Sequence, residues 1–122
     1  MRAVIADDDD DIRTLVRIAA GRAGVDVIAD VADGTSAWEA MESLTPDLAI
    51  LDAAMPGMSG LELCRKARQH PVLRDIRLVL LTAAAEAPAR ERGLAAGADE
   101  YLTKPFSPRE LVSAIAAQEF SR

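Results

Sequence analysis

Short apolar runs alternate with longer amphipathic stretches along this chain, and that alternation limits the possible folds more than any other feature. The runs occupy residues 3–6, 25–31, 48–51, 78–81 and, most weakly, 101–102. Three of them are continuous and rich in Val, Leu or Ile, which is typical of strands that are buried on both faces of a sheet. The pattern predicts five strands with helices between them.

Helices are predicted between the runs by apolar spacing and by capping residues. Apolar side chains recur at helical spacing over residues 12–23 and again over residues 37–44. Capping boxes, in which a Ser is followed three residues later by a Glu, begin two further helices at Ser59 and Ser107. A helix over residues 87–96 has the weakest pattern.

A strand followed by a helix, repeated five times, predicts a parallel sheet with helices on both faces. Right-handed crossovers make this arrangement a doubly wound α/β sandwich. In such folds ligands bind beyond the carboxyl ends of the strands. The residues that directly follow each apolar run are therefore the candidates for function.

Composition excludes several classes of protein. The 122 residues are 50% hydrophobic and 28% charged but only 3% aromatic, which predicts one soluble domain with an aliphatic core. The single cysteine, Cys64, and the single histidine, His70, cannot build a disulfide or a metal site rich in thiolate or imidazole. Neither a membrane span nor a signal peptide is visible, so we expect a cytoplasmic protein. A net charge of -6 argues against direct binding of nucleic acid.

Polar residues follow four of the five runs. Asp7 and Asp8 come after the first run, Asp52 after the third, Thr82 after the fourth and Lys104 after the fifth. Chain topology should bring them to one edge of the sheet. Two carboxylates ~4 Å apart repel by about 4 kcal/mol at an effective dielectric of ~20, so either one stays protonated or a cation compensates. An all-oxygen ligand set suits Mg²⁺.

A carboxylate beside Mg²⁺ and an ammonium group can attack phosphorus and form an acyl phosphate. The two cations would spread the charge on the phosphoryl oxygens, and Thr82 would donate a hydrogen bond to the attached group. The residues at the strand ends therefore predict storage of a phosphoryl group.

Five segments, in the same order as in a known family, carry a resemblance. They are residues 6–9, 47–52, 55–60, 81–83 and 97–106. Together they resemble the receiver domain of response regulators in two-component signalling, over residues 1–122 as a single domain with no effector domain. The resemblance implies a flavodoxin-like (βα)5 sandwich whose five-stranded parallel sheet has the strand order 2-1-3-4-5.

The resemblance also implies a role for each residue at the strand ends. Asp52 matches the phosphoacceptor. Asp7 and Asp8 match the acidic pair that binds Mg²⁺ (or Mn²⁺) together with Asp52, and the backbone carbonyl of Ala54 matches a further ligand. Lys104 matches the lysine that pairs with the phosphoryl group, and the family usually has a cis peptide bond after it.

Thr82 and Tyr101 match the switch pair of the family, in which the aromatic ring turns inward when the hydroxyl moves toward the phosphoryl group. The expected phosphoryl donor is a sensor histidine kinase or a phosphotransfer protein. The expected output is a change in the face formed by the fourth helix, the fifth strand and the fifth helix, which would bind a partner or form a homodimer. We expect a switch that phosphorylates and dephosphorylates itself, not an enzyme with substrate turnover.

Other interpretations of these residues are weaker. Residues 9–11 are acidic because they begin a helix, where carboxylates are favourable. A calcium loop that starts at Asp7 is excluded, since Ile12 and Ile18 stand where Gly and Glu are required. A phosphatase of the haloacid-dehalogenase kind needs a second Asp where this chain has Ala54. An interaction module that keeps the fold without phosphorylation remains the alternative.

The dimer used by receivers of the winged-helix DNA-binding class is not favoured by the sequence. Members of that class typically pair an arginine of the fifth helix with acidic residues near the fifth strand. Asp99 and Glu100 are present, but residues 113–117 contain no arginine.

Overall fold

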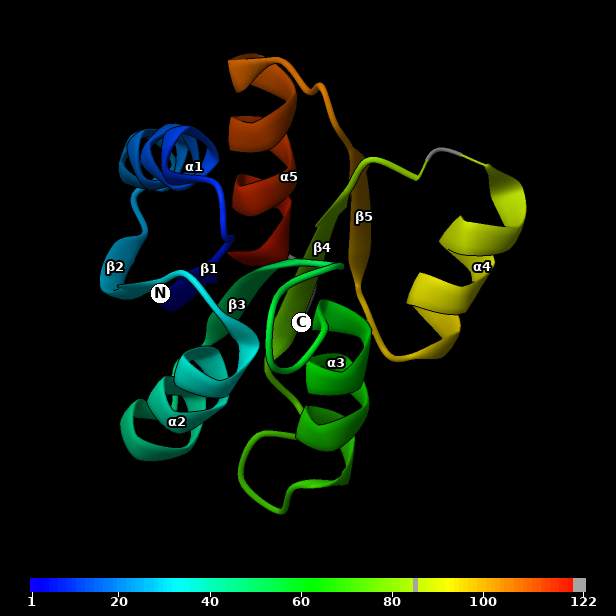
Figure 1. Cartoon of the computed structure of the whole chain (residues 1–122). Helices are drawn as coiled ribbons and strands as arrows, with labels where there is room; N and C mark the ends of the chain where they lie inside the picture. Colours follow the sequence, from blue (N-terminus) through cyan, green and yellow to red (C-terminus); the bar gives the residue numbers. More distant parts are fainter. Residues whose placement is uncertain (85, 120–122) are drawn as a thin grey trace.

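Five parallel strands form one sheet in the order β2-β1-β3-β4-β5 in the computed structural model, which describes residues 1–84 and 86–119 (Figure 1). Each predicted run lies in a strand except for Val25, which directly precedes the second strand, and the predicted flavodoxin-like arrangement with strand order 2-1-3-4-5 is confirmed. The elements are β1 (Arg2–Ala6), α1 (Asp10–Arg22), β2 (Asp26–Val31), α2 (Gly34–Leu44), β3 (Leu48–Asp52), α3 (Gly60–Gln69), β4 (Arg77–Thr82), α4 (Ala87–Ala95), β5 (Glu100–Thr103) and α5 (Pro108–Glu119).

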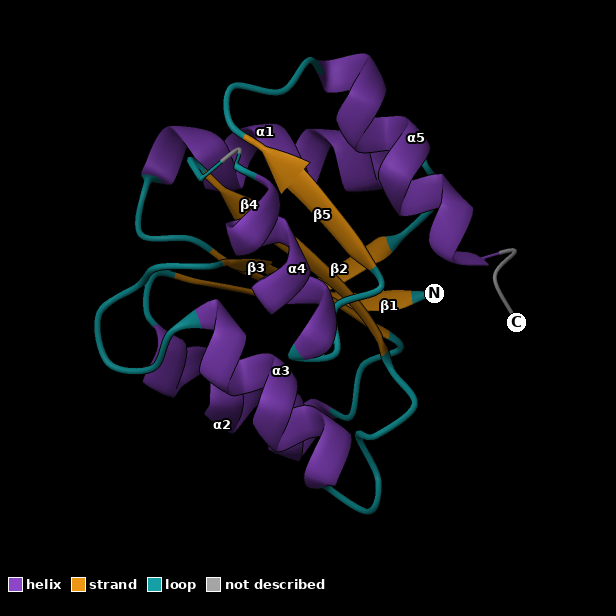
Figure 2. Ribbon diagram, turned by 90° about the vertical axis from the view of Figure 1, so that its right-hand side faces the viewer, coloured by secondary structure: helices purple, strands orange, loops and turns teal. Residues whose placement is uncertain are grey.

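Helices cover both faces of the sheet, with α1 and α5 on one face and α2, α3 and α4 on the other (Figure 2). Alternate residues of each central strand point into opposite cores, as the pleat requires. In β1, Val4 and Ala6 pack against α2 and α3, whereas Ala3 and Ile5 pack against α1 and α5. Both faces of the three central strands are therefore buried, which explains why these strands are continuous apolar runs.

The predicted helix ends are confirmed by their hydrogen bonds. Ser59 and Glu62 exchange hydrogen bonds at the start of α3, and Ser107 and Glu110 do so at the start of α5. The side chain of Asp9 accepts from the backbone at the start of α1, so the acidic run does begin a helix.

The helix with the weakest sequence pattern, α4, is anchored by few side chains. Its first turn has no side-chain cap, and it buries only small residues, Ala89 and Gly93. Gly93 lies so close to β5 that a Cβ there would meet the ring of Tyr101 at 2.7 Å. Within the described residues, no helix is both long enough and apolar enough to cross a membrane.

The carboxyl ends of β1, β3, β4 and β5 meet at one edge of the sheet. Asp52 is the last residue of β3 and pairs in register with Leu81 of β4, which precedes Thr82. The backbone N–H of Lys104 donates to the carbonyl oxygen of Thr82 at 2.6 Å. The peptide bond between Lys104 and Pro105 is cis, as the resemblance implies. The parallel register thus brings residues from distant parts of the chain to one place.

Candidate functional site

Three carboxylates gather at this edge of the sheet. One oxygen each from Asp7, Asp8 and Asp52 lies within 4.8 Å of the others. Asp7 is fully buried and Asp52 is 6% exposed, whereas Asp8 is exposed to solvent. The strand-end prediction for these three residues therefore agrees with their position in the structure.

Lys104 supplies the positive charge next to this cluster. Its Nζ donates to Asp7 Oδ2 at 2.9 Å and lies 3.5 Å from Asp52 Oδ1. Burial alone would lower the pKa of Lys104, but the hydrogen bond to Asp7 and the charges of Asp52 and Asp7 outweigh it and raise that pKa. Lys104 is therefore a fixed cation that bridges the two buried carboxylates.

Lys104 does not cancel all the negative charge of the cluster, and the excess charge contributes to a raised pKa of Asp52. Burial, followed by repulsion from Asp7, raises the pKa of Asp52 from 3.8 to about 6, and hydrogen bonding with Asp8 acts in the same direction. The charge of Lys104 and the N–H of Ala54, which donates to Asp52 Oδ1 at 3.3 Å, lower it in part. One ammonium group is therefore not enough to neutralise this cluster.

The cluster fits a small divalent cation in both chemistry and size. Carboxylate oxygens are the ligands that Mg²⁺ prefers, and opposite ligands of an octahedral Mg²⁺ lie about 4 Å apart. Asp7, Asp8 and Asp52 each offer one oxygen, and these oxygens all lie within 4.8 Å of one another. A divalent cation would also compensate the repulsion that raises the pKa of Asp52. The predicted ligand role of the Ala54 carbonyl stays a prediction.

Thr82 and Tyr101 lie in the neighbouring strands β4 and β5 that end at this site, two residues apart in register. The hydroxyl of Thr82 accepts a hydrogen bond from the N–H of Ala84 at 3.0 Å. The ring of Tyr101 is buried, and its hydroxyl donates to the carbonyl oxygen of Ala84 at 2.7 Å. Both side chains thus contact one loop residue between β4 and α4. Sequence reasoning placed the two residues but did not foresee this shared contact.

Two glycines fix the backbone beneath the site, and sequence reasoning did not single them out for this. A Cβ on Gly60 would lie 2.3 Å from the carbonyl oxygen of Asp52. A Cβ on Gly34 would lie 1.7 Å from the carbonyl oxygen of Met58, in the loop that follows β3. The Asp33–Gly34 pair, separated by one residue from the end of β2, was the available signal, because such pairs mark turns.

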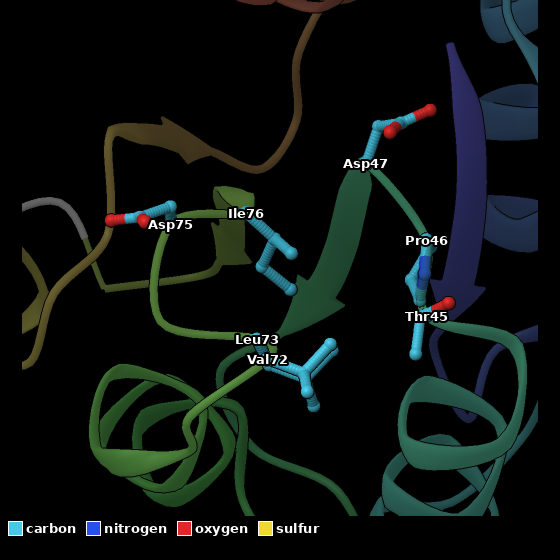
Figure 3. Close-up of a pocket in the computed structure, with 7 residues that line it drawn as sticks. All are labelled: Thr45, Pro46, Asp47, Val72, Leu73, Asp75 and Ile76. Atoms are coloured by element: carbon cyan, nitrogen blue, oxygen red, sulfur yellow. The ribbon is translucent and has the colours of Figure 1, made fainter.

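A separate hollow lies where the chain enters β3 and β4, at the amino ends of these strands (Figure 3). Its lining residues come from the segments that precede the two strands. They are Thr45, Pro46, Asp47, Val72, Leu73, Asp75 and Ile76. The acidic cluster lies at the opposite, carboxyl ends, so this hollow takes no part in the chemistry of the cluster.

The comparison with protein families agrees with this geometry. A family described as the response regulator receiver domain matches residues 3–116. This chain belongs to the response regulator receiver domains. The predicted resemblance is thereby confirmed, and with it a place in two-component signalling.

Relatives and solved structures support the same family. The receiver domain is 39% identical over 114 residues to the phosphate regulon transcriptional regulatory protein PhoB of Pseudomonas aeruginosa, covering 93% of this chain and 49% of PhoB. It is 38% identical to the DNA-binding response regulator MtrA of Mycolicibacterium paratuberculosis, covering 96% of this chain and 50% of MtrA. The receiver domain of NarL from Mycobacterium tuberculosis superimposes with a TM-score of 0.90 at 31% identity, covering 99% and 97% of the two chains. The chain spans about half the length of the curated relatives that it matches.

Asp99, the acidic residue that precedes β5, forms ion pairs within this receiver domain. Asp99 Oδ2 accepts from Arg68 Nη2 at 2.9 Å and from the N–H of Leu78 at 2.8 Å, and Asp99 Oδ1 lies 3.4 Å from Arg77 Nη2. Arg77 also donates to Gln118 of α5 at 3.1 Å. Asp99 therefore ties α3, β4 and, through Arg77, α5 to the base of β5.

Proposed function

We propose that this chain is a phosphorylation-controlled switch in which Asp52 accepts a phosphoryl group from the phosphohistidine of a sensor histidine kinase or a phosphotransfer protein. The observation that carries the proposal is the cluster of Asp7, Asp8 and Asp52 with Lys104 bridging two of its members. It combines a buried nucleophile, a fixed cation and a set of oxygens suited to Mg²⁺ or Mn²⁺. Membership of the receiver family supports it.

Each residue would contribute one element of phosphoryl transfer. An oxygen of Asp52 attacks phosphorus, the bond between phosphorus and the histidine nitrogen breaks, and the imidazole leaves with the electron pair. Lys104 would then donate to the phosphoryl oxygens, and Thr82 would turn its hydroxyl toward them. Asp7, Asp8, Asp52 and the carbonyl of Ala54 would hold Mg²⁺, which neutralises charge on the transferred group.

The readout would pass through Thr82 and Tyr101. When the Thr82 hydroxyl moves toward the phosphoryl group, it gives up its bond from the N–H of Ala84, and the loop before α4 can shift. The buried ring of Tyr101, bonded to the Ala84 carbonyl, corresponds to the inward arrangement of the switch. The face of α4, β5 and α5 would thereby change its affinity for a partner protein or a second copy.

The output partner is proposed to be a protein. PhoB and MtrA are named as a transcriptional regulator and a DNA-binding response regulator. Because this chain has a net charge of -6, we propose that residues 1–122 do not bind nucleic acid themselves. Any effect on DNA would then be indirect. Exchange with a sensor kinase would take place in the cytoplasm, and the phosphoryl group would be held and released without turnover of a separate substrate.

Intact-mass analysis after incubation with acetyl phosphate tests the proposal. We expect one phosphoryl adduct that requires Mg²⁺ and is absent from a folded Asp52→Asn variant. An adduct of equal yield on Asp52→Asn would refute the assignment of the acceptor. If no adduct forms, beryllofluoride binding is measured next. Binding that depends on Asp52 indicates rapid hydrolysis, whereas a lack of binding identifies the module as one that does not use phosphorylation.

A further inference from the structure

Arg13 of α1 binds the acidic loop, residues 7–9 between β1 and α1, and lies outside the carboxylate cluster. Its Nη1 donates to the backbone carbonyl oxygen of Asp7 at 2.9 Å. Its Nε lies 2.7 Å from Asp30 Oδ1 near the end of β2, and its Nη2 pairs with Asp10. The side chain is only 19% exposed. One guanidinium group therefore joins the loop after β1 to both the neighbouring strand and the first turn of α1.

The bond to the Asp7 carbonyl bears on Asp8, because that carbonyl belongs to the peptide bond that joins the two acids. The N–H of Asp7 donates to the Val31 carbonyl at 3.2 Å, and Asp7 Oδ1 accepts from the N–H of Asp9 at 2.9 Å. With its carbonyl also held, the peptide plane between Asp7 and Asp8 has a defined orientation. That orientation sets the direction in which the exposed side chain of Asp8 leaves the loop after β1.

We propose that Arg13 is a positioning residue for divalent-cation binding, because it orients the Asp7–Asp8 peptide so that both carboxylates face Asp52. The inference rests on the proposed function, since it assumes that the cluster holds Mg²⁺. Arg13 would not touch the cation. It acts through the backbone of a ligand, as partners beyond the direct ligands do in other metal sites.

Charge and positioning predict opposite results when Arg13 is removed. Taking away a cation near three carboxylates makes the local potential more negative, so charge alone predicts tighter binding of Mg²⁺. Loss of the hydrogen bond to the Asp7 carbonyl frees the peptide plane, so positioning predicts weaker binding. Removal of such an orienting partner typically weakens metal affinity by about 10- to 100-fold. The sign of the change therefore distinguishes the two effects.

Arg17 provides a matched control on the same helix. Its Nε donates to Asp30 Oδ2 at 3.0 Å, so it shares the carboxylate partner of Arg13. It does not contact the Asp7 carbonyl, and 57% of its side chain is exposed. Arg17→Met removes one positive charge and one ion pair with Asp30, as Arg13→Met does, but leaves the acidic loop held.

The experiment is calorimetric titration of Mg²⁺ into the metal-free wild type, Arg13→Met and Arg17→Met, each first shown to be folded by circular dichroism. We expect Arg13→Met to bind Mg²⁺ about tenfold or more weakly. Arg17→Met should stay within about twofold of the wild type, because exposed charges act weakly. Equal or tighter binding by Arg13→Met, or equal weakening in both variants, would overturn the inference.

A second variant keeps the test informative if Arg13→Met does not fold. Arg13→Lys retains the charge but cannot bind the Asp7 carbonyl, Asp30 and Asp10 together, so it should also bind Mg²⁺ more weakly. Affinity equal to the wild type would then refute the proposed role. If the wild type itself binds no Mg²⁺, the proposed metal site fails as well. If Mg²⁺ binds and Arg13 matters but no phosphoryl adduct forms, only the proposed function fails.

Discussion

Replacement of Asp52 by Asn should make the metal-free protein more stable, although Asp52 is the proposed centre of its chemistry. The pKa of Asp52 is about 6 in the folded protein, against an ordinary value of 3.8. At about 1.4 kcal/mol per pKa unit, this difference corresponds to at most about 3 kcal/mol of folding free energy. Asn resembles the protonated acid and can still accept from the N–H of Ala54, so the variant should regain most of that energy.

The stability difference between the wild type and Asp52→Asn should depend on pH in a defined direction. Below pH 3.8 the carboxyl is protonated in both states and contributes nothing. As pH rises through the interval from 3.8 to about 6, the unfolded state ionises first, so the wild type loses stability relative to Asp52→Asn. Above pH 6 the difference should be complete and constant. For a domain of this size it corresponds to a rise in Tm of roughly 10 °C.

The assay is urea denaturation of both proteins in EDTA between pH 4 and pH 8, with Asp26→Asn as the control. Asp26 is an exposed carboxylate at the start of β2, so its replacement should change stability little at any pH. Saturating Mg²⁺ should reduce the difference in stability between Asp52→Asn and the wild type, because the wild type binds the cation more tightly and is stabilised by it. A stability gap that is absent at pH 8 or unchanged down to pH 4 would refute the reasoning.

Four further substitutions test other features of the structure. Lys104→Met leaves the fully buried Asp7 without its cation, so stability in EDTA should fall by roughly 3 kcal/mol in urea denaturation. An undiminished stability would show that this pair is not important. Gly60→Ala places a Cβ against the carbonyl oxygen at the end of β3 and should cost about 1–3 kcal/mol in thermal unfolding. Gly21→Ala, with nothing within 4 Å of the new Cβ, should instead stabilise α1 by about 0.5–1 kcal/mol, and equal effects would contradict the steric argument. Thr45→Asn, at a position with φ of 43°, should stabilise the end of α2 by about 1 kcal/mol, and a lower Tm would argue against strain there.

The parts of the fold that could be predicted from sequence depend on local pattern. Continuous apolar runs mark strands that are buried on both faces, and Ser–Glu pairs mark the starts of α3 and α5. The positions of Asp7, Asp52 and Lys104 at one edge followed from topology alone, since parallel strands present their carboxyl ends together. No three-dimensional information was needed for these predictions.

The parts that could not be predicted depend on which of several neighbours a side chain selects. Lys104 lies closer to Asp7 than to Asp52, although both carboxylates were expected near it. The sequence pattern assigned Asp99 no partner, whereas in the structure it binds Arg68 and Arg77 of its own chain. Such choices are set by packing between distant segments, and sequence spacing does not contain that information.

The bond between Lys104 and Asp7 joins residues 97 positions apart, and it has a consequence for synthesis of the chain. Asp7 follows β1, the first strand of this sheet to be synthesised, whereas Lys104 follows β5, the last strand of the sheet. A partly translated chain therefore holds its acidic residues without the ammonium group that neutralises them, and long-range pairings of this kind form late. The cluster should thus be complete only after β5 has been synthesised and the domain has folded, so a nascent chain that lacks β5 would also lack the site.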